Sequence, residues 1–127
     1  MSLTIGSLAP ADLERYRKSL KNRLAITQSQ AGTRFKKAGE IASRAALLLK
    51  DEFGVKKVLM FGSLVHPPLF HIHSDVDLAV WGLAGKEYYR AVGILQGLDP
   101  EIGVDLIAFE DASTSIQDTI LREGREL

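Results

Sequence analysis

The 127-residue chain contains no cysteine. This excludes disulfides, thiolate metal sites and cysteine nucleophiles, and it fits a reducing cytoplasm. No apolar run approaches the roughly 18 residues that a membrane-spanning helix needs, and the N-terminus shows no recognisable signal peptide. We therefore expect a cytoplasmic protein without a membrane partner, with one domain, because the chain is long enough for one hydrophobic core but short of two.

The chain also has no net charge, but the charges are unevenly distributed. Residues 1–57 hold 12 Lys and Arg against 5 Asp and Glu, whereas residues 58–127 hold 4 against 11. The basic half is either a solvated helix face or a region that attracts phosphate, and the acidic half can bind cations. No DNA- or RNA-reading module is recognisable, so nucleic acid is not an expected partner.

Hydrophobic periodicity predicts a small α/β sandwich. A helix is expected over residues 8–29, with the apolar stripe Leu13, Tyr16, Leu20 and Leu24. Gly32 is expected to end or interrupt it, and a second helical pattern runs up to Phe53. The remaining predicted elements are strands 58–61, 76–81 and 104–109, a loop or broken helical turn over 64–74, and helices 86–98 and 113–123.

Three acids interrupt the apolar strands. Residues two apart in a strand point to the same face, so Asp75 and Asp77 present two carboxylates together. Asp105 has the same setting, and all three converge if their strands are neighbours. Carboxylates this close repel one another unless a cation is present. Mg²⁺ suits such oxygen ligands, and two ions about 4 Å apart could activate the attacking oxygen and stabilise the leaving oxygen.

A Gly-Ser pair follows the first predicted strand. Gly62 allows a phosphate to approach the backbone closely. The Ser63 hydroxyl and the amides after it can donate hydrogen bonds to phosphate oxygens. A phosphate cradle opposite a metal site suits nucleotidyl transfer from a metal–nucleoside triphosphate complex.

The segments "FGS", "SDVDLAVWG" and "VDLIAF", with the closing "ILREGREL", resemble the minimal nucleotidyltransferase (MNT) family of the DNA polymerase β-like superfamily. The resemblance covers the chain from about Ala31. It implies a nucleotidyltransferase fold, with a mixed β-sheet flanked by helices, over residues 31–127, preceded by a helical extension over residues 1–30. It also implies that Gly62 and Ser63 bind phosphate, that Asp75 and Asp77 bind the metals, and that Asp105 completes the metal site and orients or deprotonates the acceptor hydroxyl.

The resemblance further implies a Mg²⁺-dependent transferase that uses ATP or another nucleoside triphosphate. Many such proteins are paired as antitoxins with a HEPN-domain toxin, on which they adenylylate a tyrosine. The predicted function is therefore AMP transfer to a hydroxyl of a HEPN-type partner. Two alternatives stay open, a binding module that neutralises its partner by occlusion and a small-molecule adenylyltransferase. The stripe at Leu13, Tyr16, Leu20 and Leu24 is a docking or homo-oligomer surface, or packs on the chain's own core.

The loop after Gly-Ser departs from the family pattern. Members commonly continue with a small residue, an arginine and a glycine, whereas this chain continues with Leu64-Val65-His66-Pro67-Pro68. The two prolines remove two amide donors. His66, His71 and His73 invite a zinc interpretation, but their spacing matches no recognised zinc pattern, which favours phosphate contact or a solvated loop. Trp81, Tyr88 and Tyr89 either stack on a ligand or pack.

Overall fold

A computed structural model describes residues 10–127, and its longest element is the helix α1 (Pro10–Phe53). The expectation that Gly32 ends or interrupts this helix is wrong, because α1 runs through it without a break. A single glycine costs only about 1 kcal/mol in a helix interior, and the good helix formers Ala31 and Arg34 lie close to it. The proposed boundary between residues 30 and 31 therefore falls inside one helix, and the division into two parts stays a prediction.

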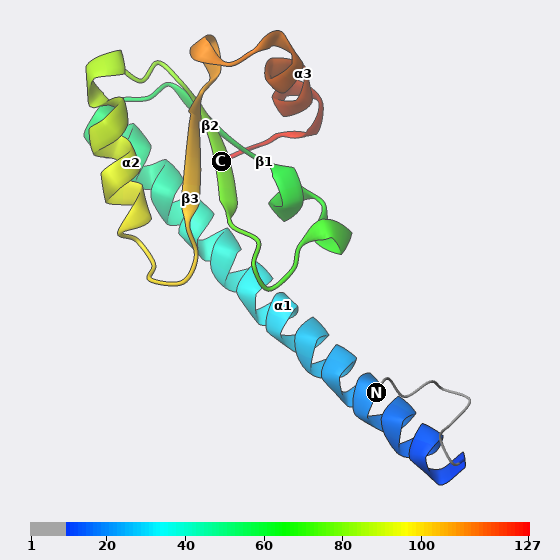
Figure 1. The fold of residues 1–127 in the computed structure, drawn as a ribbon. Helices are drawn as coiled ribbons and strands as arrows, with labels where there is room; N and C mark the ends of the chain where they lie inside the picture. The colour runs from blue at the N-terminus through cyan, green and yellow to red at the C-terminus, as the bar shows by residue number, and fades with distance from the viewer. Residues whose placement is uncertain (1–9) are drawn as a thin grey trace, which may run out of the picture.

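The two halves of α1 differ in their surroundings. From Phe35 onward the helix packs on the sheet through small and apolar side chains, including the fully buried Ala38 and Leu49. Its N-terminal half projects away from the body of the molecule (Figure 1). There Tyr16 and Leu20 are 53% and 43% exposed. They do not contribute to the core of residues 10–127, so this part of the stripe is available to a partner. The side chain of Leu24 lies outside the described residues.

The sheet has four strands in the order β3-β2-β1-β4. β1 pairs antiparallel with both β2 and β4, whereas β2 and β3 are parallel, so the expected mixed sheet is confirmed. The strands are β1 (Lys57–Phe61), β2 (Val76–Trp81), β3 (Val104–Ala108) and β4 (Arg125–Glu126). The first three match the predicted strands within one residue at each end.

Helices cover both faces of this sheet. Val76, Leu78 and Val80 are fully buried on the face that packs against α1 and α2 (Tyr88–Gln96). On the opposite face Leu59 and Ala79 pack against Ile120. Ile120 belongs to α3 (Thr114–Glu123), which begins at the N-cap Ser113, whose hydroxyl accepts a hydrogen bond from the Ile116 amide. This arrangement confirms the predicted α/β fold with helices flanking the sheet.

The segment between β1 and β2 contains two short 3₁₀ turns, η2 (Gly62–Val65) and η3 (Pro67–Leu69). It is therefore the broken helical turn that the sequence predicts. Two further 3₁₀ turns precede α2 and follow β3, η4 (Gly85–Glu87) and η5 (Phe109–Asp111). Across residues 10–127, no helix is both long enough and apolar enough to cross a membrane.

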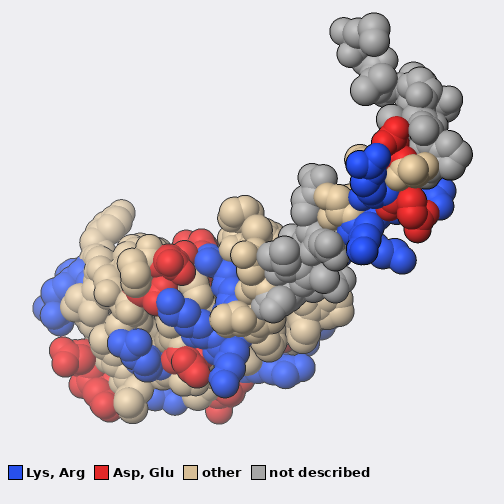
Figure 2. Space-filling view, turned by 90° about the horizontal axis from the view of Figure 1, so that it is seen from below, with Lys and Arg blue, Asp and Glu red and all other residues tan. Residues whose placement is uncertain are grey.

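The projecting helix carries exposed charges of both signs. Figure 2 shows blue and red side chains on the projecting part of α1 and on the visible face of the body, and the exposed acids of the projecting part are Asp12 and Glu14. The exposed basic residues there are Arg15, Arg17, Lys18 and Lys21. Arg15 is paired with Asp12 at 2.8 Å, one turn earlier. Among its described side chains, the projecting helix therefore carries more exposed basic residues than acidic ones.

Candidate active site

Two of the three predicted acids are direct neighbours in the sheet. The parallel register of β2 and β3 pairs Asp77 with Asp105. Residues paired in this way carry their side chains on the same face. Asp75 lies two residues before Asp77 and immediately before β2, and the buried valines and leucine of β2 point to the other face. The strand neighbours that the sequence analysis required are therefore present, and they bring the three acids to one end of the sheet.

The electrostatics of Asp77 reflect this crowding. The pKa of Asp77 is raised to about 6, mainly by burial and in addition by the negative charges of Asp105 and then Asp75. Each cause disfavours the ionised form of a carboxyl group, the first by desolvation and the others by like-charge repulsion. A cation bound among these carboxylates would oppose both effects.

Gly62 lies against Asp77 from the other side. Phe61, the last residue of β1, pairs with Asp77 in the antiparallel register, and Gly62 follows it with φ of +74°. A side chain at Gly62 would collide with Asp77 Oδ2. Both the positive φ and this close approach favour glycine. Ser63 follows within η2, where its carbonyl oxygen accepts a hydrogen bond from the His66 amide at 3.1 Å. Phosphate binding by Gly62 and Ser63 stays a prediction.

Asp75 is fixed by two donors that the sequence analysis did not identify. Its Oδ1 accepts hydrogen bonds from Arg34 Nη2 at 3.1 Å and from the Gly103 amide at 3.0 Å. Arg34 comes from α1, and Gly103 immediately precedes β3. The available signal was the position of Arg34 four residues before the buried Ala38, on the helix face that packs against the sheet. Its contact with Asp75, 41 residues away, has no signature in the sequence.

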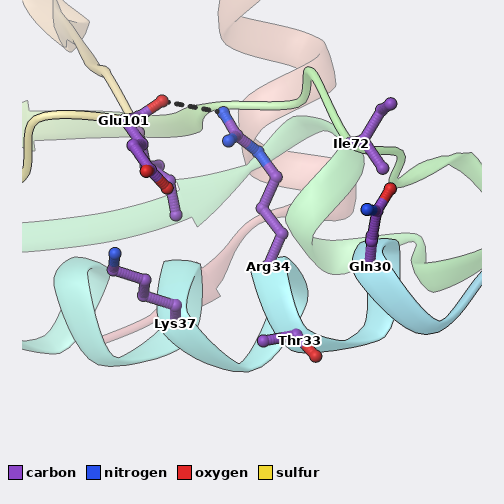
Figure 3. A pocket seen from close by; sticks show the side chains of 7 residues that line it. Gln30, Thr33, Arg34, Lys37, Ile72 and Glu101 are labelled. Carbon is purple, nitrogen blue, oxygen red and sulfur yellow. Dashed lines mark hydrogen bonds between the residues drawn. The ribbon is translucent and has the colours of Figure 1, made fainter. Parts of the chain in front are cut away.

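A cavity of about 420 Å³ lies beside this contact, between α1 and the segments that precede β2 and β3. Its lining includes Gln30, Arg34, Lys37, Ile72 and Glu101, and Figure 3 shows Arg34 reaching from α1 across the cavity to Glu101. Apolar and charged side chains are therefore mixed in its walls.

The Lys37 ammonium in the cavity wall is paired with an Asp99 carboxylate oxygen at 3.1 Å. Asp99 also accepts hydrogen bonds from the amides of Glu101 and Ile102, both at 2.9 Å. The Glu101 amide makes the largest contribution to lowering the pKa of Asp99, and Lys37 adds to it. Asp99 thus shapes the turn before β3 and holds Lys37 at the same time.

The histidines of the loop are engaged in local contacts. His66 Nε2 lies 3.3 Å from Glu123 Oε2 on α3, and the His73 amide donates to His71 Nδ1 at 3.1 Å. Within residues 10–127, no group of three His, Cys, Asp or Glu side chains already has a geometry suited to a metal ion. This statement includes the histidines and the three acids. The role of Asp75, Asp77 and Asp105 as metal ligands stays a prediction.

Packing accounts for two of the three aromatic candidates. Trp81 stacks on Phe109 with ring centroids 4.3 Å apart, and the Tyr88 hydroxyl donates to the Leu106 carbonyl oxygen at 2.7 Å. Tyr89 is 84% exposed. Of these three side chains, Tyr89 therefore has the largest surface available to a ligand or partner.

Comparison with known proteins identifies the family of this chain. The sequence profile described as polymerase beta, nucleotidyltransferase matches residues 45–127. The chain belongs to this nucleotidyltransferase family. The match includes Gly62, Ser63 and the three acids, and it confirms the resemblance inferred from the sequence and the assignment to the nucleotidyltransferases. Arg34 precedes the matched region. No curated protein matches the chain significantly.

Solved structures share the fold. A chain from a mutant MntA–HpeT toxin–antitoxin complex is 21% identical, with a TM-score of 0.56, over 67% of this chain and 70% of that one. A chain from a toxin–antitoxin complex with AMP-PNP is 22% identical, with a TM-score of 0.55, over 65% and 69%. A third comes from a complex of an MNT antitoxin with a tri-AMPylated Shewanella oneidensis HEPN toxin, and is 20% identical with a TM-score of 0.54 over 70% of each chain.

Proposed function

We propose that this protein is a Mg²⁺-dependent nucleotidyltransferase that moves AMP from ATP to a hydroxyl of a HEPN-type partner protein, as the antitoxin of a toxin–antitoxin pair. The observation that carries the proposal is the register pair of Asp77 and Asp105, with Asp75 two residues away, inside the region that matches the family. The choice of ATP and of a HEPN-type acceptor is supported by the neighbours that contain AMP-PNP and an AMPylated HEPN toxin.

The donor set at this end of the sheet fits Mg²⁺. Carboxylate oxygens are the ligands that Mg²⁺ prefers. The pKa of Asp77 is raised by burial and by the negative charges of Asp105 and Asp75, and a cation would oppose both effects. The residues that would hold the ion are Asp75, Asp77 and Asp105. When bound, Mg²⁺ would neutralise part of the triphosphate charge and stabilise the leaving pyrophosphate oxygen.

The proton of the acceptor hydroxyl requires a base, and Asp105 is the best placed of the three acids to take it. Asp105 is exposed, whereas Asp77 is half-buried and Asp75 Oδ1 already accepts two hydrogen bonds. As the proton moves to Asp105, the hydroxyl oxygen bonds to the α-phosphorus and the bond from that phosphorus to pyrophosphate breaks. The products are an AMP ester on the acceptor and pyrophosphate.

Gly62 and Ser63 are assigned to the triphosphate. Gly62 begins the turn directly against Asp77, so a phosphate held by the amides after Gly62 would lie close to the carboxylates. The Ser63 hydroxyl is a donor next to it. Pro67 and Pro68 in η3 lack amide hydrogens, so fewer backbone donors remain after Ser63 than in loops of the usual family sequence.

A partner protein is the expected acceptor because the body of this chain is a single small domain. Beyond the site, the projecting half of α1 offers an exposed surface on which Tyr16 and Leu20 are accessible, with more basic than acidic residues among its described side chains. A partner that docks there would present its own hydroxyl to the acids.

The proposal is tested by incubating the protein with α-labelled ATP, Mg²⁺ and the HEPN-domain protein encoded by the adjacent reading frame. We expect label on the partner with the wild type and with the control Asp118→Asn, which alters an exposed acid on α3. We expect none with the double variant Asp75→Asn/Asp77→Asn. A tight complex without label, in the wild type and the double variant alike, would overturn the enzymatic proposal and favour inhibition by occlusion.

A further inference from the structure

Arg34 connects α1 to the segments that precede both acid-bearing strands. Its Nε donates to the Ser74 carbonyl oxygen at 2.8 Å, and its Nη2 donates to Asp75 Oδ1 at 3.1 Å and to the Glu101 carbonyl oxygen at 3.2 Å. Ser74 and Asp75 lead into β2, and Glu101 lies three residues before β3. One guanidinium therefore links the starts of the two strands that carry Asp77 and Asp105.

The side chain of Arg34 is well placed to hold this geometry because it is only 16% exposed. Two of its three acceptors are backbone carbonyl oxygens, so its position does not depend on the ionic contact with Asp75 alone. A guanidinium has several donors in one rigid plane, which lets it serve diverging acceptors at once. A lysine ammonium at this position would keep the charge but not this fork of donors.

The same contacts define the orientation of Asp75. The Arg34 guanidinium and the Gly103 amide both donate to Oδ1. Without Arg34 the carboxylate would keep one of these two donors, and the segments before β2 and β3 would lose a link between them. The orientation of Asp75 relative to Asp77 and Asp105 would then be less well defined.

We propose that Arg34 is a positioning residue of the active site, which holds Asp75 and the starts of β2 and β3 so that the three carboxylates act as one set. This inference rests on the proposed function of those acids. It extends the functional unit into α1, beyond the region from residue 45 onward that matches the family.

The effect of removing Arg34 on cation binding distinguishes a positioning role of this residue from a role through its charge alone. If Arg34 acted only through its positive charge, its removal would strengthen cation binding, because a repulsive charge next to the carboxylates would be gone. If Arg34 positions Asp75, its removal weakens cation binding in spite of that lost repulsion. A role in stability alone would lower the melting temperature and leave cation binding of the folded protein unchanged.

The test measures Mn²⁺ binding to the full chain by electron paramagnetic resonance, well below the melting temperature of each variant. Arg34→Met is compared with the wild type and with Arg44→Met, the same substitution at an exposed position of α1. We expect Arg34→Met to bind Mn²⁺ about tenfold more weakly, as is usual when a residue that orients a metal ligand is lost, and Arg44→Met to match the wild type. Arg34→Lys keeps the charge but loses the planar set of donors, so we expect it to bind Mn²⁺ more weakly than the wild type as well.

A second readout is the rate of AMP transfer to the partner, in which we expect kcat to fall more than KM for ATP rises. Mn²⁺ affinity of Arg34→Met equal to or greater than that of the wild type would overturn the positioning role, and so would wild-type affinity in Arg34→Lys. If the wild type itself binds no Mn²⁺ at millimolar concentrations, the proposed metal-dependent function fails and this inference fails with it.

Discussion

Asp105 and the predicted phosphate-binding turn lie on opposite sides of Asp77, and different kinds of structure hold them. On one side, β3 continues the sheet and sets Asp105 in register with Asp77. On the other side, β1 ends at Phe61 and the chain enters two short 3₁₀ turns, beginning with Gly62 and Ser63. The acids are therefore placed by strand pairing and by Arg34, whereas the turn is placed by its own 3₁₀ hydrogen bonds and by the burial of Leu64 and Val65.

We therefore expect substitutions on the two sides of Asp77 to affect different steps of the reaction. Asp77 and Asp105 lie in strands whose pairing fixes their spacing, so changes there should act on the chemical step. The turn lacks amide donors at Pro67 and Pro68, and His66 in it pairs with Glu123 of α3. Changes in the turn should act mainly on the binding of the triphosphate.

The largest effect is expected from Asp77→Asn. The side chain keeps its size but loses the charge that would hold Mg²⁺, and metal stabilisation of the transition state is worth several kcal/mol. We expect kcat for AMP transfer to fall roughly a thousandfold, with ATP binding less affected. A higher KM for ATP with kcat within threefold of the wild type would contradict the assignment of Asp77 to the chemical step.

Gly62→Ala should have the next largest effect, because Gly62 begins the predicted phosphate-binding turn and lies directly against Asp77. The added Cβ would collide with Asp77 Oδ2, and the φ of +74° is unfavourable for alanine by about 1–2 kcal/mol. We expect a loss of stability of that size and, since small displacements of reacting groups are costly, about a hundredfold lower kcat/KM.

The matched control is Gly32→Ala in α1, where an added Cβ meets no atom within 4 Å and should stabilise the helix by about 1 kcal/mol. Chemical denaturation and steady-state kinetics measure both variants. Equal stability of Gly62→Ala and the wild type would show that the close approach to Asp77 is not a constraint.

Ser63→Ala tests the turn alone. Loss of one hydroxyl donor to a charged phosphate oxygen is worth about 1.5–3 kcal/mol. We expect KM for ATP to rise at least about tenfold, while kcat changes little. A wild-type KM, measured in the same transfer assay, would remove Ser63 from the phosphate site and shift attention to other donors.

The elements that the sequence predicted well are those whose pattern is local. Val76 to Trp81 alternates between core residues and the acid face, and the strand was placed within its observed bounds. The continuity of α1 through Gly32 was not predicted, because a glycine can either end a helix or be tolerated within it. β4 was missed because two residues, Arg125 and Glu126, are too short to produce a pattern.

The candidate site shows the same limit. Asp75, Asp77 and Asp105 were singled out because charged residues within or beside apolar strands stand out, and the pairing of β2 with β3 brings Asp77 and Asp105 together. Their role as one site stays a prediction. Arg34 was missed because its contact with Asp75 depends on how a helix crosses the end of the sheet. The amide of Gly103 was missed because backbone donors carry no residue-specific signal.

The smallest expected effect is on stability as a function of pH. The folded protein holds the Asp77 proton up to a pKa of about 6, against an ordinary value of 3.8. Stability associated with this group is therefore fully present below about pH 4 and is lost as the pH rises through about 6. Solvent screening of this half-exposed carboxyl keeps the effect small, at roughly a few °C.

Melting temperatures of the wild type and Asp77→Asn, in buffer with a chelator at pH 4 and pH 7.5, test this expectation. Asp77→Asn should be more stable than the wild type at pH 7.5, and the advantage should shrink at pH 4. An advantage that is the same at both values would mean that the pKa of Asp77 is not raised.

The central claim is that the acids catalyse transfer of a nucleotidyl group, and the most direct test is which phosphate of ATP reaches the partner. Parallel reactions would contain the protein, Mg²⁺, the HEPN-domain partner and ATP labelled at either the α- or the γ-phosphate. The account predicts label on the partner from α-labelled ATP and none from γ-labelled ATP. Label from the γ-phosphate, or from neither while the two proteins still form a complex, would contradict it.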